Sequence, residues 1–189
     1  YRFSEEIRNE VRRELGLEKN FVIGHIGRFS PQKNHKFLLS IFSEICKKNP
    51  DSKLVLVGKG PLEDDVRVLA DRLSIKEHIV FLGARSDVPR LLQGMDAFLL
   101  PSRYEGLGIV LVEAQASGLK CFASNTVSKE ANVTDLLTYI ELEQSAEYWA
   151  DKILSSISYE REDKIKDIVA SGFDIRKSAA ELEAFYLNA

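Results

Sequence analysis

Cysteine is scarce in this sequence, and its two thiols do not predict a disulfide framework. Cys46 and Cys121 are far apart, and each lies in an apolar setting. Two buried thiols in a reducing compartment is the interpretation that we prefer. The sequence also lacks a signal peptide and any apolar run long enough to cross a membrane. We therefore expect a soluble, cytoplasmic protein.

An excess of charge of one sign is missing too. The 26 basic and 29 acidic residues give a formal net charge of −3, and both signs are scattered along the chain. The absence of a basic stripe argues against a protein that binds nucleic acid or a membrane surface. With 189 residues, 44% of them hydrophobic, the chain suits one α/β domain. It has no initiator methionine, and Tyr1 lies within a pattern, so we expect a piece of a longer protein.

Motifs for several kinds of chemistry are absent. The three histidines have no metal-ligand spacing, and no Asp-x-Asp pair occurs that would hold a divalent ion against a nucleotide diphosphate. Neither a P-loop nor the Gly-x-Ser-x-Gly turn of a serine hydrolase is found. We therefore expect no metal and no cofactor.

The sequence does contain a strand followed by a glycine loop and a helix. Residues 96–100 are an apolar run that predicts a strand, and a helical pattern that includes Glu113 follows the loop. The loop contains Glu105, Gly106 and Gly108. A glycine turn before a helix presents backbone N–H groups and a positive dipole end to an anion. Two acids beside such a site are unexpected, unless the anion is attached to a group rich in hydroxyls.

Strand and helix alternate along the rest of the chain. Near-continuous apolar strands between helices predict a parallel sheet with helices on both faces. We expect an α/β, Rossmann-like fold with about six strands and a helical tail from residue 145. Pro61 suits the first position of a helix. The expected strands cover 21–27, 53–58, 79–83, 96–100, 120–124 and 137–142, and the expected helices include 4–15, 62–73 and 87–92.

Ligands of an open parallel sheet bind at the carboxyl ends of its strands. The residues that follow the strands here are mostly cations, glycines and hydroxyl side chains. They predict a ligand that is anionic and also presents hydroxyls. These residues are Arg28 and Lys33, Gly58 and Gly60, Gly83 and Arg85, 102–108, and Ser124 and Asn125.

Two of these groups allow opposing interpretations. Arg28 and Lys33 would match a diphosphate, although a single loop cation is usually just solvated. We favour the diphosphate because both residues follow a strand that looks central. Gly58 and Gly60 begin like a dinucleotide fingerprint but lack its third glycine. A tight turn therefore explains them at least as well as contact with a ligand.

The two acids also allow several interpretations. Glu105 and Glu113 could be the paired carboxylates of a glycosidase, or they could be ordinary surface acids. Glu113, however, lies in a strongly apolar helix, where an unpaired buried charge would be costly. We expect it to accept hydrogen bonds, for which the diol of a ribose is a good donor. Glu105 in the loop could accept from sugar hydroxyls.

Together these residues resemble a known family. The run EGLGIVLVEA at 105–114 resembles the E-x7-E signature of retaining glycosyltransferases of the GT-B fold, in the large family 4 (glycosyl transferases group 1). GRF and QKN within 27–34 look like the family's diphosphate-binding segment. Residues 57–61 and 80–83 are similar to its next strand-end motifs. The resemblance covers about residues 2–186. Residues 124–131 depart from the commoner glycine-rich version of the family and look more like capsular or exopolysaccharide members.

The resemblance implies a role for individual residues. Arg28 and Lys33 would bind the donor diphosphate and stabilise the leaving group. Glu113 would bind the ribose hydroxyls, and Glu105 the transferred sugar. The backbone after Phe81 and the side chain of Arg85 would frame the base. The further donor-binding residues that it implies are Gly58, Gly60, Phe81, Arg85, Gly106, Leu107 and Gly108.

The resemblance also implies an enzyme and its organisation. The chain (1–189) would be the single donor-binding domain of a hexosyltransferase that needs no metal. The acceptor, a glycan or a lipid-linked glycan, would bind an N-terminal domain that this chain lacks. We therefore expect the chain alone to bind donor without transferring sugar, and 174–188 to expose apolar surface. The whole enzyme would be cytoplasmic or peripheral at the inner face of the membrane.

Two alternatives stay open. One is a nucleotide-sugar epimerase with a GT-B-like fold, which the E-x7-E run fits less well. The other is a non-enzymatic doubly wound regulatory domain, which would need acids rather than cations at the strand ends. The sequence does not settle the base or the sugar. We expect a UDP-sugar because it is a common activated form in polysaccharide synthesis.

Overall fold

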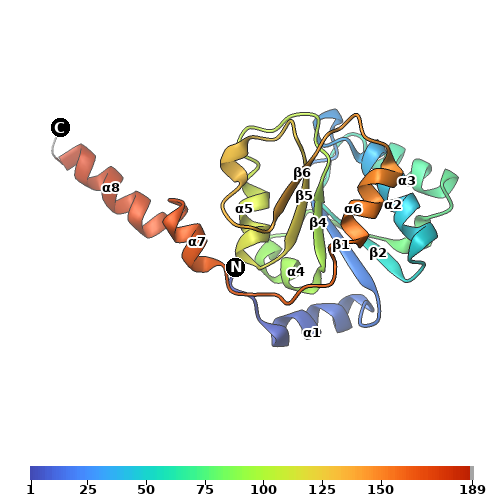
Figure 1. The fold of residues 1–189 in the computed structure, drawn as a ribbon, viewed down its shortest axis with the longest axis horizontal. Helices are drawn as coiled ribbons and strands as arrows, with labels where there is room; N and C mark the ends of the chain where they lie inside the picture. The colour runs from blue at the N-terminus through green and yellow to red at the C-terminus, as the bar shows by residue number, and fades with distance from the viewer. Residues whose placement is uncertain (188–189) are drawn as a thin grey trace.

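A computed structural model describes residues 1–187 and contains a six-stranded parallel sheet between two layers of helices (Figure 1). The strand order is β3-β2-β1-β4-β5-β6, and every neighbouring pair of strands is parallel. The predicted fold class is confirmed. The strands are β1 (Phe21–Ile26), β2 (Ser52–Val57), β3 (Ile79–Gly83), β4 (Ala97–Leu100), β5 (Lys120–Ser124) and β6 (Leu137–Ile140).

The helices alternate with these strands as expected. Ser4 caps the first helix, since its Oγ accepts from the backbone N–H of Ile7, and Gly16 ends it with φ 65°. The helices are α1 (Glu5–Leu15), α2 (His35–Lys48), α3 (Glu63–Arg72), α4 (Val88–Gly94), α5 (Ile109–Ala116), α6 (Ala146–Leu154), α7 (Ile165–Ala170) and α8 (Ile175–Leu187), with 3₁₀ turns η1 (Pro31–Lys33), η2 (Lys76–His78) and η3 (Lys129–Ala131).

Alternate residues of the apolar strands enter two separate cores. Ile23 and Leu54 pack against α2, α3 and α6, whereas Val22 and Val55 pack against α1, α4 and α5. Both faces of the sheet are therefore covered, which is why the strands show no polar face in the sequence. Both cysteines are free, and Cys121 is buried as expected, whereas Cys46 is only half-buried.

The prediction for Pro61 was wrong by two residues, because α3 begins at Glu63. The segment before the helix is held in a turn instead. The N–H of Leu62 donates to the carbonyl of Phe29 (3.2 Å), and the N–H of Glu63 donates to the carbonyl of Gly60 (3.2 Å).

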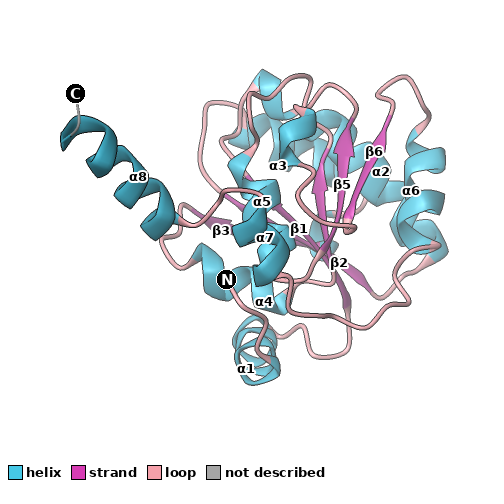
Figure 2. Cartoon of the chain, turned by 60° about the vertical axis from the view of Figure 1, so that its left-hand side comes forward, coloured by secondary structure: helices cyan, strands magenta, loops and turns pink. Residues whose placement is uncertain are grey.

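The C-terminal part is helical with one interruption. Residues 155–164 form an extended crossing between α6 and α7, and α8 projects away from the body (Figures 1 and 2). As expected, α8 exposes apolar side chains, including Ile175 (79%) and Phe185 (67%). Asn188, at the end of the expected segment, lies outside the described residues. Within residues 1–187, no helix is both long and apolar enough to cross a membrane.

Two glycines let the loop after β2 touch the loop after β1. A Cβ on Gly58, which has φ 139°, would lie 2.0 Å from the carbonyl oxygen of Gly27. A Cβ on Gly60 would lie 2.4 Å from the carbonyl oxygen of Phe29. This close approach fixes the start of the loop that carries Arg28 and Lys33.

We expect Gly58→Ala to lower the free energy of unfolding by about 3 kcal/mol, because backbone strain and overpacking each cost about 1–3 kcal/mol. Gly16→Ala is the matched control. Gly16 has φ 65°, but a Cβ at this position would meet no atom within 4 Å. This variant should lose only about 1 kcal/mol from strain. Urea denaturation measures both variants, and an equal loss would contradict the close approach.

Candidate functional site

The candidate site lies where the strand order reverses direction. β1 pairs with β4 on one side and with β2 on the other, so the loops after β1 and β4 leave the same edge of the sheet side by side. In open α/β sheets, the crevice at such a switch point is where ligands bind. The structure thus brings Lys33 and Glu105 together, as the sequence led us to expect.

An ion pair between these two residues forms the centre of the site. Lys33 Nζ lies 2.6 Å from Glu105 Oε1, and the two side chains are only 15% and 9% exposed. Ser102 Oγ donates to the same carboxylate oxygen at 2.8 Å. Gln32 Nε2 donates to the other oxygen, Oε2, at 3.2 Å. A buried carboxylate needs such partners, and these donors from two loops supply them to both oxygens of Glu105.

Backbone contacts hold the same loops together. The N–H of Arg103 donates to the carbonyl of Gln32 (2.8 Å), and Asn34 Nδ2 donates to the carbonyl of Pro101 (3.1 Å). On the other side, Thr126 Oγ1 donates to the carbonyl of Ser102 (2.9 Å). The loop after β4 is therefore held between the loops after β1 and β5.

The N-terminus of α5 adds free backbone donors to this edge. Gly108 has φ 67°, a conformation that favours glycine, and turns the chain into the helix. Within residues 1–187, the backbone N–H groups of Leu107, Gly108, Ile109 and Val110 have no acceptor. Gly106 before them is exposed. Such a helix start is suited to bind an anion.

Glu113 lies one turn further along α5 and is half-buried. Its Oε1 accepts a hydrogen bond of 2.5 Å from the hydroxyl of Tyr1. Burial and the carboxylate both raise the pKa of Tyr1, so the phenol stays protonated and donates. The expectation that Glu113 accepts a hydrogen bond is met by a residue that sequence reasoning did not single out.

Three residues implied by the resemblance lie apart from the ion pair. Arg28 is exposed, and its guanidinium has no partner within residues 1–187. The ring of Phe81 packs on the α3 side of the sheet, with the guanidinium of Arg67 3.9 Å from its centre. Arg85 points to the start of α4, where its Nε lies 2.7 Å from Asp87. Gly58 and Gly60 are accounted for by the loop contact described above.

A buried histidine pair lies beneath Lys33 and was not expected as part of the site. His25, in β1, donates from Nδ1 to the carbonyl of Leu99 (2.8 Å), and its ring meets that of His35 edge to face at 4.8 Å. His35 also stacks on Phe29 at 4.3 Å. Burial, with the nearby charge of Lys33, lowers the pKa of both rings. Residues 1–187 contain no group of three or more acids, histidines or cysteines arranged to hold a metal ion.

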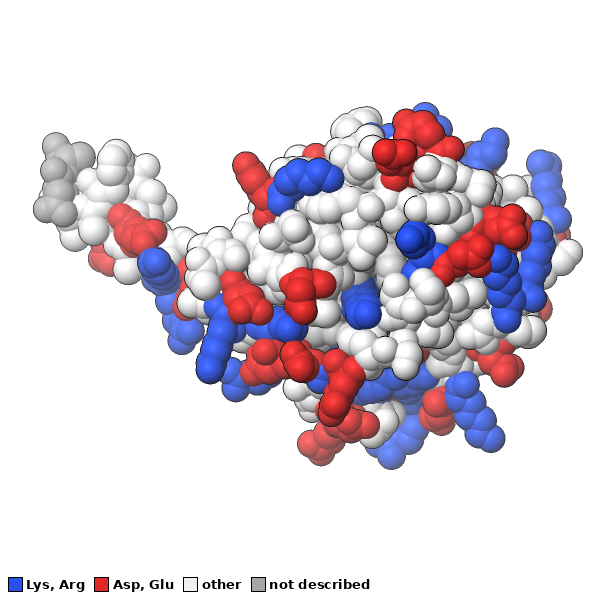
Figure 3. Space-filling model, in the orientation of Figure 1, with Lys and Arg blue, Asp and Glu red and all other residues white. Residues whose placement is uncertain are grey.

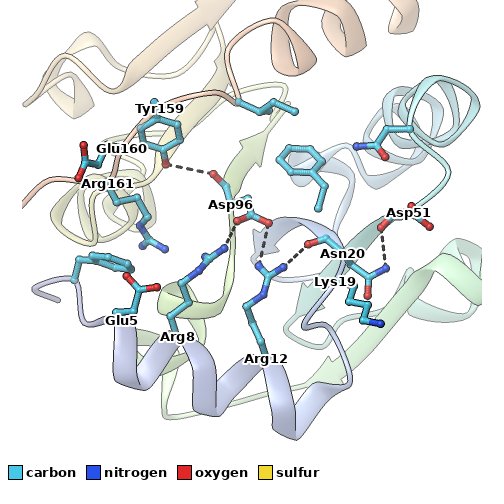
Figure 4. Close-up of a pocket in the computed structure, with 14 residues that line it drawn as sticks. Glu5, Arg8, Arg12, Lys19, Asn20, Asp51, Asp96, Tyr159, Glu160 and Arg161 are labelled. Atoms are coloured by element: carbon cyan, nitrogen blue, oxygen red, sulfur yellow. Dashed lines mark hydrogen bonds and ion pairs between the residues drawn. The ribbon is translucent and has the colours of Figure 1, made fainter.

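A hollow of about 600 Å³ lies at the opposite end of the sheet, beside the start of β4 (Figure 4). Asp96 accepts there from Arg8 (2.5 Å), from Arg12 (3.0 Å) and from the backbone N–H of Val22 (2.7 Å). These bonds tie α1 to the sheet. The charges that line the hollow balance one another, with Arg8, Arg12, Lys19 and Arg161 against Glu5, Asp51, Asp96 and Glu160. Mixed charge also covers the face shown in Figure 3.

Comparison with known proteins links this chain to one enzyme family. The family model described as "Glycosyl transferases group 1" matches residues 7–168. The chain is 34% identical over 169 residues to "Putative glycosyltransferase EpsF" of Bacillus subtilis, covering 87% of this chain and 44% of the relative. It is 30% identical over 186 residues to the "UDP-Gal:alpha-D-GlcNAc-diphosphoundecaprenol alpha-1,3-galactosyltransferase" of Escherichia coli, covering 92% and 47%.

A solved structure supports the same fold. Anabaena Alr3699/HepE, crystallised in complex with UDP and glucose, matches with a TM-score of 0.82 at 23% identity. The match covers 100% of this chain and 54% of that one. The chain therefore spans about half the length of the relatives that it matches.

We expect stability to fall in acid because of the histidine pair. The pKa of His35 is lowered from 6.5 to about 4. Between these values the unfolded chain binds a proton that the folded chain does not. The free energy of unfolding therefore contains the full contribution of neutral His35 above pH 6.5. This contribution, about 3 kcal/mol, is lost as the pH falls toward 4.

His35→Phe and His35→Gln should both flatten this pH dependence, measured by urea denaturation at a series of pH values. The two replacements differ in shape and hence in overall stability. They share only the loss of the ionisable ring, so both must reduce the slope by the same amount. A wild-type slope in either variant would contradict the assignment to His35.

Proposed function

This chain belongs to the glycosyl transferases group 1 family, whose enzymes have the GT-B fold, and we propose that it binds the nucleotide-sugar donor. The observation that carries the proposal is the edge formed by β1 and β4. There, Lys33 and the free N–H groups at the start of α5 can meet a diphosphate, and Glu105 and Glu113 can meet hydroxyls on either side of it.

Arg28 and Lys33 bind the diphosphate in this proposal. Lys33 is anchored by Glu105, whereas Arg28 is exposed and has a guanidinium free to close over a ligand. The N–H groups of Leu107 and Gly108, with the turn at Gly106, supply neutral donors. Fixed charges and dipoles of this kind stabilise a leaving group without rearranging during the reaction.

The acids bind the two sugars of the donor. Glu113 accepts from the ribose hydroxyls, and Glu105 accepts from the transferred sugar. The base lies against the backbone that follows Phe81, beside Arg85. Because Arg85 is held by Asp87 and Phe81 packs under Arg67, main-chain atoms rather than these two side chains contact the base. Gly58 and Gly60 keep the neighbouring loop in place.

We propose a retaining hexosyl transfer of the family 4 type that uses no metal. The donor is a UDP-sugar, which the names of the galactosyltransferase of Escherichia coli and of the UDP complex of HepE support. The acceptor is a glycan or a lipid-linked glycan, in the synthesis of a capsular or extracellular polysaccharide. The enzyme works in the cytoplasm, peripherally at the inner face of the membrane.

Residues 1–189 are the donor-binding domain alone in this proposal. The acceptor site lies in a second domain, in the part of the relatives that this chain does not cover. The apolar side chains of α8 would pack against that domain.

We expect UDP to bind to residues 1–189 and to raise their thermal stability. A ligand at about 100 times its Kd adds about 2.7 kcal/mol. Lys33→Met and Glu113→Gln should each weaken binding at least about tenfold, because each removes a charge-assisted contact. Lys47→Met is the control, since that lysine is 65% exposed and pairs with Glu44 near the far end of α2. Titration calorimetry with UDP, GDP and ADP measures the binding. Indifference to all three would refute the proposal.

We also expect residues 1–189 to bind UDP-glucose or UDP-galactose without releasing UDP from it. In this proposal the acceptor site and the catalytic groups beside it belong to the second domain. A coupled assay for UDP, run at a donor concentration at which calorimetry shows saturation, should give the rate of a protein-free control. Turnover above that rate would mean that one domain is sufficient for catalysis.

A further inference from the structure

The contact between Tyr1 and Glu113 joins the start of the chain to α5. The phenol donates to Oε1 at 2.5 Å, across 112 positions of the sequence. Within residues 1–187, Oε2 of Glu113 has no partner, and no lysine or arginine pairs with this carboxylate. Glu113 is thus oriented by one neutral donor, which leaves its charge uncompensated and its second oxygen available.

The segment that carries Tyr1 is itself firmly held. Gln93, only 2% exposed at the end of α4, donates from Nε2 to the carbonyl of Tyr1 (3.5 Å) and accepts at Oε1 from the N–H of Ser4 (3.1 Å). The ring of Phe3 lies 4.1 Å from the guanidinium of Arg161. These contacts bind the segment from α4 on one side and from the crossing between α6 and α7 on the other.

We infer that Tyr1 is a positioning residue, which holds the carboxylate of Glu113 so that Oε2 faces the ribose hydroxyls of the nucleotide. The inference rests on the proposed donor-binding function. A carboxylate offers about four acceptor sites. The phenol occupies one of them, so a ribose diol can bind while Tyr1 stays in place. An arginine or lysine in the same position would compete for Oε2, whereas a single phenol donor fixes the rotamer and leaves that oxygen free.

The alternative is that Tyr1 occupies the position of a ribose hydroxyl and must leave before the nucleotide binds. The two cases predict opposite effects of Tyr1→Phe. Loss of a positioning hydroxyl weakens nucleotide binding, whereas loss of a competitor strengthens it. The contact also predicts that the effect of Tyr1→Phe on binding depends on the ribose hydroxyls, because only these groups of the nucleotide would bond to Glu113.

The experiment is calorimetry of residues 1–189 with UDP and with 2′,3′-dideoxyuridine diphosphate. Tyr1→Phe should weaken UDP binding about three- to tenfold, because the carboxylate loses the hydrogen bond that orients it toward the ribose. Binding of the dideoxy nucleotide should be unchanged within the error of the measurement. In a Glu113→Gln background, Tyr1→Phe should cost nothing more, since the group that it orients is already altered.

Tyr148→Phe is the matched control. Tyr148 is 41% exposed, as Tyr1 is 42% exposed, and it lies on α6, on the opposite face of the sheet. Removing the hydroxyl of Tyr148 should leave UDP binding unchanged. Equal losses for UDP and the dideoxy nucleotide in Tyr1→Phe, no loss at all, or tighter binding would each overturn the inference while leaving the proposed function intact. If wild-type protein fails to bind UDP, the proposed function fails, and the inference falls with it.

Discussion

The ion pair between Lys33 and Glu105 is the constraint on which the site depends. Each side chain comes from a loop that leaves an adjacent parallel strand, and both are largely buried. Removing either partner would leave a charge in a low-dielectric setting, so neither loop can move alone without a large cost. Ser102 and Gln32 complete the hydrogen bonds of the carboxylate and so make the pair stable in this geometry. The pair therefore holds the ammonium group of Lys33 at one position on the edge of the sheet. An unpaired lysine side chain would move through many positions in solvent.

Glu113 is a second partly buried carboxylate, and its hydrogen-bond partner is neutral rather than cationic. It has no cationic partner within residues 1–187, and the hydroxyl of Tyr1 supports it instead. A phenol stabilises the charge less than an ammonium does, which leaves the carboxylate more able to accept further hydrogen bonds. The two acids that looked alike in the sequence are thus distinguished by their environments. Glu105 is paired with a cation that also shapes the site, whereas Glu113 has only the phenol of Tyr1 as a partner within residues 1–187.

The sequence predicted most of the fold because its signals are local. β3 and β5 begin and end at the predicted residues, since their apolar runs are bounded by polar or glycine residues. The rule for strand ends predicted that Lys33 and Glu105 share one edge of the sheet, but not that they form an ion pair. The partner of Glu113 could not be predicted, because a contact across 112 positions leaves no periodic signal. The contact between Phe81 and Arg67 was not predicted either, since a strand that is apolar on both faces does not reveal which residue points where.

The two ends of the sheet show how stability and binding are separated. At the amino end, Asp96 joins Arg8, Arg12 and the backbone of β1 in a network in which both oxygens of its carboxylate accept hydrogen bonds. That network fastens α1 and leaves no net charge in the hollow beside it. At the carboxyl end, Arg28 and the N–H groups at the start of α5 have no partner within the described residues. These unpaired donors add little to stability, and their place at one edge of the sheet is consistent with the proposed donor site there. This difference in charge favours the β1–β4 edge over the hollow beside Asp96 as the proposed binding site.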